Sequence, residues 1–264
     1  MANMRLDAAL AARGLARSRT HAAKLIADGL VTVAGVAVVK ASTPVTDSQP
    51  IEVAATDHYV SRAAHKLIAG LDTFGVKVDG LLALDVGAST GGFTQVLLER
   101  GARAVIALDV GHGQLVEAIR SDARVRVVEG ANARYLTEQS LAELSGTSET
   151  PMLVVSDLSF ISLRTVLPAL HAAVGDAAEY VLLVKPQFEV GRTNIREGIV
   201  HQAALRDEAI MNVLWAAWDL GLGTAGVIAS PIAGNAGNRE YLVWLSAGSG
   251  SNPSEWMGRV SAIS

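Results

Sequence analysis

The sequence contains no cysteine, which excludes disulfide bonds and thiolate chemistry. It also lacks a long apolar run: Gly, Asp, Arg or Ser interrupts every stretch well before the roughly 20 residues that a membrane-spanning helix needs. The first residues have neither a continuous apolar signal-peptide core nor a plausible cleavage site. These absences predict a soluble protein of the cytoplasm with no stable membrane association.

Apolar residues, by contrast, are plentiful, since half of the 264 residues are hydrophobic. This length accommodates one large α/β core and a small accessory domain. Charge is distributed unevenly: residues 1–40 hold six Lys and Arg against two Asp, a net charge of +4, which leaves −8 for the rest of a chain whose total is −4. A basic N-terminal segment followed by an acidic remainder is expected where only one part of a protein binds nucleic acid. A solvated basic helix face explains the charge equally well.

The N-terminal residues predict two short helices followed by a β-hairpin. Gly14 and Gly29 end the two helices, and Ser18 is a good N-cap for the second. The pair Ala34-Gly35 is a tight turn between two apolar strands. The residues that recur at helical spacing on the apolar faces are Leu6, Ala9, Leu10, Ala22, Leu25 and Ile26. Strands are expected at 30–33, 36–39 and 51–53.

Beyond a boundary near residues 56–61, apolar strands alternate with amphipathic helices. The expected strands are 81–87, 104–110, 125–130, 152–158, 180–186, 224–230 and 241–246. Alternation of this kind predicts a mostly parallel sheet covered on both faces. The last two strands leave no room for a helix between them and should pair antiparallel. The tail after Ser246 is expected to be loosely held.

A glycine-rich turn closes the first of these strands and opens a helix, so that backbone can approach a ligand closely. Its residues are Asp85, Gly87, Ala88, Ser89, Thr90, Gly91, Gly92 and Phe93. Asp109 ends the second strand, where a carboxylate can accept hydrogen bonds from the ribose of an adenosine. The turn lacks a full G-x-G-x-x-G, which favours S-adenosylmethionine over a dinucleotide. Asn132, after the third strand, is placed to reach the adenine or is simply a turn residue.

Four charged residues stand at or beside strand ends, where open α/β sheets bind ligands. They are Lys66, Asp157, Lys185 and Glu240. Any one alone is explained by a solvated charge at the edge of the sheet, but four at one edge indicate a catalytic site. Asp157 is also expected to contact the cofactor.

The chemistry that this set suits is transfer of a group to a ribose 2′-hydroxyl, which keeps its proton near neutral pH and needs a base. A lysine accepts that proton only in its neutral form, which burial beside a second ammonium group favours. Lys66 and Lys185 would supply the pair, and Asp157 and Glu240 would position them and offset their desolvation.

Motifs along the whole chain resemble the TlyA or hemolysin-A family, in which an RNA-binding domain first seen in small-subunit ribosomal protein four precedes an FtsJ-like domain. The shared segments are ARSR, VSRAAHKL, LDVGASTGGFT, DVGHGQL, SDLSFISL, LVKPQFEVG and GNREYLVWL. The resemblance implies a class I Rossmann-like α/β methyltransferase with a seven-stranded sheet. It further implies methylation of cytidine ribose in ribosomal RNA of the small and often the large subunit. The residues expected to bind RNA are Arg5, Arg17, Arg19, Lys24 and Arg62.

The expected domain limits are 1–56 for the RNA-binding domain, 57–65 for a linker, 66–250 for the methyltransferase domain and 251–264 for a tail. No His, Asp and Glu cluster has metal-ligand spacing, so no metal site is expected. The alternatives are a Rossmann-type oxidoreductase, a membrane-active hemolysin, and a ribosome-binding protein with an idle catalytic domain. The oligomeric state is left open.

Overall fold

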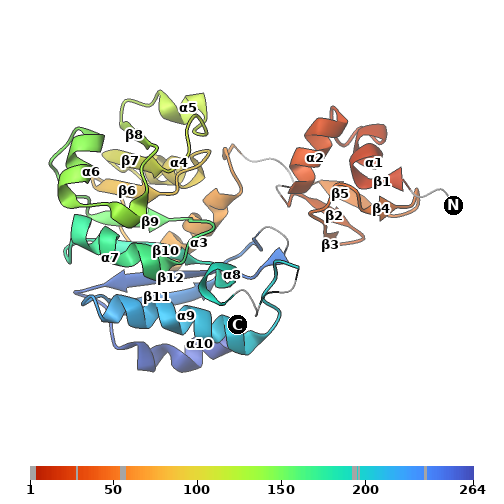
Figure 1. Ribbon diagram of the computed structural model, residues 1–264. Helices are drawn as coiled ribbons and strands as arrows, with labels where there is room; N and C mark the ends of the chain where they lie inside the picture. Colours follow the sequence, from red (N-terminus) through yellow and green to blue (C-terminus); the bar gives the residue numbers. More distant parts are fainter. Residues whose placement is uncertain (1–3, 28, 54–57, 192–194, 196, 235–236) are drawn as a thin grey trace. The chain divides into compact units, whose positions relative to one another are not determined.

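The computed structural model describes residues 4–27, 29–53, 58–191, 195, 197–234 and 237–264 (Figure 1). The chain divides into two compact units at Arg62, with the larger unit formed by residues 63–234 and 238–264. Helix α3 (Ala63–Phe74) begins inside the stretch expected to be a linker, and its residues Ala64 and Leu67 are already fully buried. The limits at residues 56 and 65 otherwise stay predictions.

The N-terminal unit has the predicted two helices and a hairpin. Both turn residues have positive φ, 51° at Ala34 and 77° at Gly35, as a tight hairpin turn requires. The helices are α1 (Leu6–Ala12) and α2 (Arg19–Ala27). The strands are β1 (Met4–Arg5), β2 (Val31–Val33), β3 (Val36–Ala37), β4 (Pro44–Val45) and β5 (Ile51–Val53). Strand β2 lies between β3 and β5, while β1 and β4 form a separate pair that the sequence pattern did not predict.

A small apolar core holds this unit together. All six residues predicted for the apolar helix faces are buried, and Val31 and Ile51 of the sheet join them. The helix faces therefore pack as their spacing predicts, and Arg19 and Lys24 of α2 are left at the surface, whereas Asp7 of α1 is buried.

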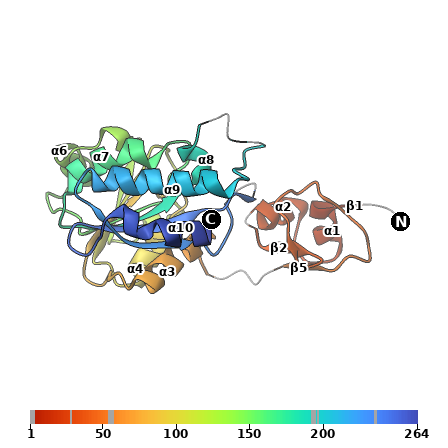
Figure 2. The same cartoon turned by 90° about the horizontal axis from the view of Figure 1, so that it is seen from below.

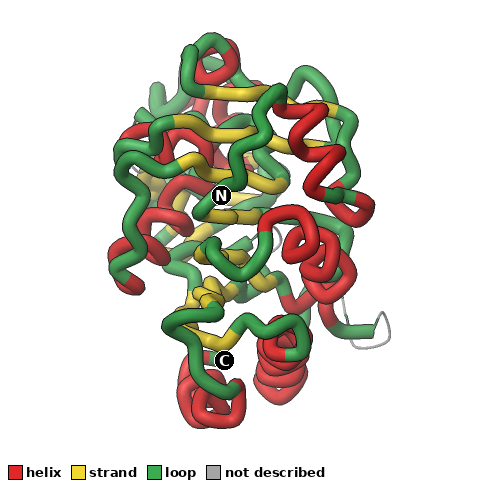
Figure 3. Tube along the Cα trace, turned by 90° about the vertical axis from the view of Figure 1, so that its left-hand side faces the viewer, coloured by secondary structure: helices red, strands yellow, loops and turns green. Residues whose placement is uncertain are grey.

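The larger unit is built on one seven-stranded sheet, in the order β11-β12-β10-β9-β6-β7-β8. Its strands are β6 (Leu82–Val86), β7 (Ala104–Asp109), β8 (Val125–Glu129), β9 (Leu153–Ser156), β10 (Glu179–Val184), β11 (Gly223–Ala229) and β12 (Tyr241–Ser246). Strand β12 runs antiparallel to both of its neighbours, and the other strand pairs of this sheet are parallel. Figure 3 shows the strands of this sheet lying side by side. The predicted mostly parallel sheet is confirmed.

Helices cover both faces of the sheet. Helices α3 and α4 lie on one face, and α6, α7 and α9 lie on the other (Figure 2). Helix α10 lies beside α9 and contacts β11. Their bounds are α4 (Gly92–Glu99), α5 (Glu117–Arg120), α6 (Glu138–Ser145), α7 (Leu163–Val174), α8 (Pro186–Glu189), α9 (Ala203–Trp218) and α10 (Met257–Ile263), with short 3-10 turns η1 (Ala133–Tyr135) and η4 (Pro253–Trp256).

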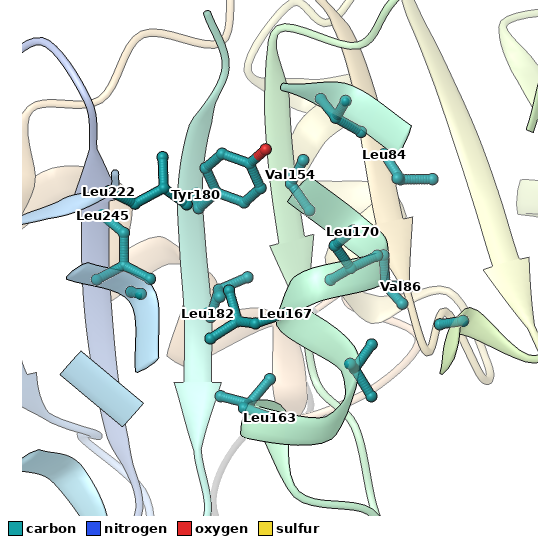
Figure 4. Packing of buried hydrophobic residues seen from close by; sticks show 14 of the residues in the cluster. Leu84, Val86, Val154, Leu163, Leu167, Leu170, Tyr180, Leu182, Leu222 and Leu245 are labelled. Atoms are coloured by element: carbon teal, nitrogen blue, oxygen red, sulfur yellow. The ribbon is translucent and has the colours of Figure 1, made fainter. Parts of the chain in front are cut away.

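The larger core lies between the sheet and α7. Leu163, Leu167 and Leu170 point from α7 toward side chains that alternate along the strands, such as Leu84 and Leu182 (Figure 4). Because successive side chains of a strand point to opposite faces, the residue after Leu84 points toward the α3 and α4 face. That residue is Asp85, whose surroundings are described below.

The expectation of a loosely held C-terminal tail is wrong. Residues 257–263 form α10, which packs against α9 and β11, and Val260 is 1% exposed. Trp256 and Ile263 also pack against the main core. The apolar residues of this segment are scattered in the sequence, and they lie on one side of the chain only when the segment is helical.

Candidate active site

The four predicted charged residues meet at one edge of the sheet. Parallel strands β9 and β10 end at that edge, and Asp157 and Lys185 come directly after them. Strand β12 starts there because it runs in the opposite direction, with its first residue, Tyr241, paired with Val184. Glu240 immediately precedes β12. The ends of the neighbouring strands β9, β10 and β12 therefore position Asp157, Lys185 and Glu240 at the same edge of the sheet.

Helix α3 supplies the fourth, Lys66. A Cβ atom at Gly70 would lie 3.1 Å from a methyl carbon of Leu242, so this glycine lets α3 lie close on the sheet. Lys66 is four residues earlier and lies on the same side of the helix. Its side chain is consequently directed along the sheet toward the edge instead of into solvent.

The four side chains form a continuous series of ion pairs. Lys66 Nζ lies 2.6 Å from Glu240 Oε2 and 3.6 Å from Asp157 Oδ2. Lys185 Nζ lies 2.6 Å from Asp157 Oδ1. Asp157 thus lies between the two lysines, and each lysine has one carboxylate at close range, as predicted from the sequence.

Burial differs along this series. The side chains of Glu240 and Lys66 are 2% and 6% exposed, whereas those of Lys185 and Asp157 are 10% and 16% exposed. Burial raises the pKa of Asp157, but the ammonium groups of Lys66 and Lys185 outweigh it, so this pKa lies below its usual value. Asp157 is therefore an anion at neutral pH, and the Lys185–Asp157 end of the series is the more accessible one.

Two side chains near Lys185 were not predicted. Lys185 Nζ donates to Ser159 Oγ at 2.8 Å. Glu189, in α8, accepts from Leu163 N at 2.7 Å and from the hydroxyl of Ser162, the N-cap of α7. These bonds connect the segment after β9 to the segment after β10. Ser and Glu are common in loops and at helix ends, so the sequence alone does not mark Ser159 and Glu189 as site residues. Their contacts in the folded protein do.

Aromatic rings join the same two segments. Phe160 is 93% exposed and has a φ of 65°, in the left-handed region that bulky residues rarely adopt. Its ring centroid lies 5.4 Å from that of Phe188. The segments that carry Asp157 and Lys185 are thus in contact through polar and aromatic side chains.

The glycine-rich turn adjoins this edge. Gly87 has a φ of 87°, and a Cβ there would lie 3.1 Å from the carbonyl oxygen of Asp157. Gly91 has a φ of 100° and precedes the first residue of α4, and a Cβ there would lie 2.9 Å from Leu115. Side chains at these two positions would be strained, so glycine is required for the turn itself as well as for close approach of a ligand. The other predicted residues of the turn, Ala88, Ser89, Thr90, Gly92 and Phe93, follow in the same loop and the first turn of α4.

Asp109 is bound to the turn through both carboxylate oxygens. Oδ2 accepts from Ser89 N at 2.8 Å, and Oδ1 accepts from Gly111 N at 2.7 Å. Together with Gln114 and Glu129 these residues line a small pocket. Each carboxylate oxygen has a second lone pair for a further donor, so Asp109 fits the predicted ribose hydroxyls without breaking the turn.

Asp85 is fully buried beneath this turn. Its Oδ2 accepts from Thr94 Oγ1 of α4 at 2.6 Å, while Oδ1 has no hydrogen-bond partner among the described residues. Burial raises its pKa to about 7. An unpartnered buried oxygen, two glycines with positive φ and the Asp109 carboxylate fit a polar nucleoside-like cofactor. Asn132 is exposed, and its side chain accepts from Arg134 N to cap η1, which is the turn role that the sequence analysis left open.

The predicted RNA-binding residues lie in the first unit. Arg17 and Lys24 are exposed, and Arg62 ends the N-terminal stretch of that unit. The structure brings Arg5 and Arg19 together through Asp7, which the sequence analysis did not single out.

A model of the FtsJ-like methyltransferase family matches residues 59–247. The chain belongs to this family. Residues 4–51 match the S4 domain, so the FtsJ-like domain follows an S4 domain in this protein. Dependence on S-adenosylmethionine and the predicted family are thereby confirmed.

Several relatives of the FtsJ-like protein cover most of its length. It is 49% identical over 244 residues to the 16S/23S rRNA (cytidine-2'-O)-methyltransferase TlyA of Mycobacterium tuberculosis, which spans 91% of this chain and 89% of that protein. It is 39% identical to Hemolysin A of Brachyspira hyodysenteriae, over 90% of this chain and 98% of that protein. A solved structure described as a putative hemolysin from Streptococcus thermophilus has a TM-score of 0.75 to this protein and 36% sequence identity. The superposition covers 99% of this chain and 95% of the Streptococcus thermophilus chain. In the described part of the FtsJ-like protein, no helix is long and apolar enough to cross a membrane.

Proposed function

We propose that this protein methylates the 2′-hydroxyl of cytidine in ribosomal RNA of the small and the large subunit, with S-adenosylmethionine as methyl donor. The observation that carries this proposal is the ion-paired series Lys66, Asp157, Lys185 and Glu240 beside the glycine-rich turn. The activity named for the Mycobacterium tuberculosis relative supports the same substrate. A protein that modifies ribosomal RNA works where ribosomes assemble, in the cytoplasm.

The residues that would hold the cofactor are those of the turn with Asp109 and Asp157. Gly87 and Gly91 bring backbone close, and Asp109 accepts the ribose hydroxyls. When bound, S-adenosylmethionine supplies an electrophilic methyl group on a sulfonium. Asn132 is proposed to reach the adenine in addition to capping η1.

Lys185 is proposed as the general base. It lies at the more accessible end of the ion-paired series, and its Nζ is the atom that would accept the proton of the ribose hydroxyl. Ser159 Oγ can accept a hydrogen bond from the ammonium and donate one to the neutral amine, because a hydroxyl does both. The hydroxyl therefore holds Lys185 in place in either protonation state.

The remaining residues position Lys185 and keep the charges balanced. Glu240 pairs with Lys66, and Asp157 lies between the two lysines. Two buried ammonium groups without these carboxylates would carry a large desolvation cost. Lys66 is proposed to help hold the target ribose, and its ammonium group disfavours a second positive charge at Lys185, as a proton acceptor requires.

RNA binding is proposed to come mainly from the S4 domain, through Arg5, Arg17, Arg19, Lys24 and Arg62. Phosphate contacts dominate RNA affinity, and the exposed guanidinium and ammonium groups of this basic unit suit them.

Replacement of Lys185 by Arg tests the proposed base most sharply. Arginine keeps the positive charge but stays protonated near neutral pH, so it cannot accept the proton. We expect Lys185→Arg and Lys185→Ala to lose methyl transfer in single-turnover assays on purified ribosomal subunits, while the affinities for S-adenosylmethionine and RNA stay nearly unchanged. Near-normal turnover by the Arg variant would show that Lys185 is only an electrostatic support.

The substrate is tested separately by mapping 2′-O-methylation of ribosomal RNA from cells with and without the protein. A methylated cytidine that is present only with the protein is expected in both subunits. If both maps were identical, ribosomal RNA would not be the substrate.

A further inference from the structure

One buried carboxylate in the S4 domain binds two arginines from different segments. Asp7 Oδ1 and Oδ2 accept from Nε and Nη2 of Arg5, each at 3.1 Å. The same Oδ2 accepts from Nη2 of Arg19 at 3.1 Å. Arg5 precedes α1 and Arg19 begins α2, so Asp7 fixes the two guanidinium groups relative to each other.

The three side chains differ greatly in exposure. That of Asp7 is 8% exposed, whereas those of Arg5 and Arg19 are 53% and 61% exposed. Hydrogen bonds, first of all from Arg5, hold the pKa of Asp7 at about 2, so the carboxylate is ionised at any pH where RNA binding would be measured. Two cations and one anion leave a net charge of +1 at this point of the surface.

The arginines keep most of their donors for a ligand. A guanidinium has five N–H donors in one plane, of which Asp7 uses two from Arg5 and one from Arg19. Planar groups held at a fixed separation suit the bidentate recognition of a phosphate, which flexible single charges do not provide.

We infer that Asp7 is a positioning residue that holds Arg5 and Arg19 as a fork for one backbone phosphate of the RNA. This inference rests on the proposed RNA-binding role of the S4 domain. Arginines that are already ordered lose less side-chain entropy when they bind. Asp7 therefore strengthens RNA binding although its own charge repels RNA.

Asp7 has two opposite effects on RNA affinity: its negative charge weakens binding, and its ordering of Arg5 and Arg19 strengthens it. The experiment separates these two effects. Full-length Asp7→Asn is compared with Asp47→Asn, which removes the same charge from an exposed side chain of the same domain. Binding to purified ribosomal subunits is measured over a range of salt concentrations. Electrostatics alone predicts equal or tighter binding for both variants. We expect Asp7→Asn to bind roughly two- to tenfold more weakly for each arginine released, and Asp47→Asn not to weaken binding. If Asp7→Asn binds like Asp47→Asn, the inference is overturned.

A second variant keeps the inference testable if Asp7→Asn fails to fold, which circular dichroism and thermal melting would show. Arg19→Lys keeps the charge of an exposed residue but loses the planar fork. We expect it to bind RNA about as weakly as Arg19→Ala. If Arg19→Ala is weakened while Arg19→Lys binds like wild type, the fork is wrong and the RNA-binding role of the domain stands. If Arg19→Ala itself binds like wild type, the proposed role of Arg19 in RNA binding is wrong, and the inference fails with it.

Discussion

Asp109 shows how one side chain is shared between the fold and the proposed cofactor. Both of its oxygens already accept backbone N–H groups, from Ser89 and Gly111, so the carboxylate orders the turn before any ligand arrives. A preorganised acceptor binds a ribose more tightly than one that must be fixed on binding.

We expect Asp109→Ala to weaken S-adenosylmethionine binding by roughly tenfold to a hundredfold, because hydrogen bonds to a charged group are lost. Isothermal titration calorimetry measures this directly, and binding to ribosomal subunits is the control that should not change. Unchanged cofactor affinity would remove Asp109 from the ribose-binding role.

Asp85 predicts a dependence of stability on pH. Burial raises its pKa to about 7, against 3.8 in an unfolded chain. Between these values the folded state keeps a proton that the unfolded chain has lost, so stability falls as pH rises and the loss is complete above about 7.

We therefore expect Asp85→Asn, which cannot titrate, to gain thermal stability relative to wild type as pH rises from 5 to 8. The difference in Tm between the two proteins cancels the titration of all other groups. Melting curves at several pH values would give it, and a difference that is constant over this range would show that Asp85 does not titrate there.

At the scale of elements, Gly234, in the loop between β11 and β12, lies in close contact with Glu240 of the ion-paired series. A Cβ atom at Gly234 would lie 2.0 Å from Oε1 of Glu240. Gly234 N also donates to the carbonyl of Asn238 at 2.8 Å. The loop thus sets the position of Glu240, and through it that of Lys66.

Gly234→Ala should consequently displace Glu240 and lower methyl transfer on ribosomal subunits at least tenfold, as expected when a group that positions the reacting centre moves by about 1 Å. Gly248→Ala is the matched control, since a Cβ there meets no atom within 4 Å. Equal activity of the two alanine variants would contradict the role of this loop.

At the scale of the whole molecule, charge is divided between the two units. The basic S4 domain is proposed to bind RNA, while the acidic FtsJ-like domain contains the ion-paired series and the proposed cofactor site. Such a division predicts that RNA affinity and cofactor affinity can be changed independently.

Replacement of Arg17, Arg19 and Lys24 by Gln tests this division. If each contacts one phosphate, the slope of log affinity against log salt should decrease by roughly two to three. S-adenosylmethionine affinity, measured by calorimetry on the same variant, should not change. An unaltered salt dependence would place the RNA-binding surface elsewhere.

Much of the fold and of the candidate site was predictable from local patterns. Strand alternation, the glycine-rich turn and the charges that follow Ser156 and Val184 are properties of neighbouring residues, because side-chain periodicity and backbone freedom act within a few positions. The sequence by itself therefore determined the sheet, the turn and the four charged residues.

The tertiary structure alone decided which of these residues touch. The antiparallel direction of β12 puts Glu240 beside Lys66, the bonds of Ser159 and Glu189 join two loops, and Asp7 gathers two arginines. It also turned the expected loose tail into α10. These pairings join residues that are separate in the sequence, and their energies depend on burial and on distances that exist only once the sheet and its helices have packed.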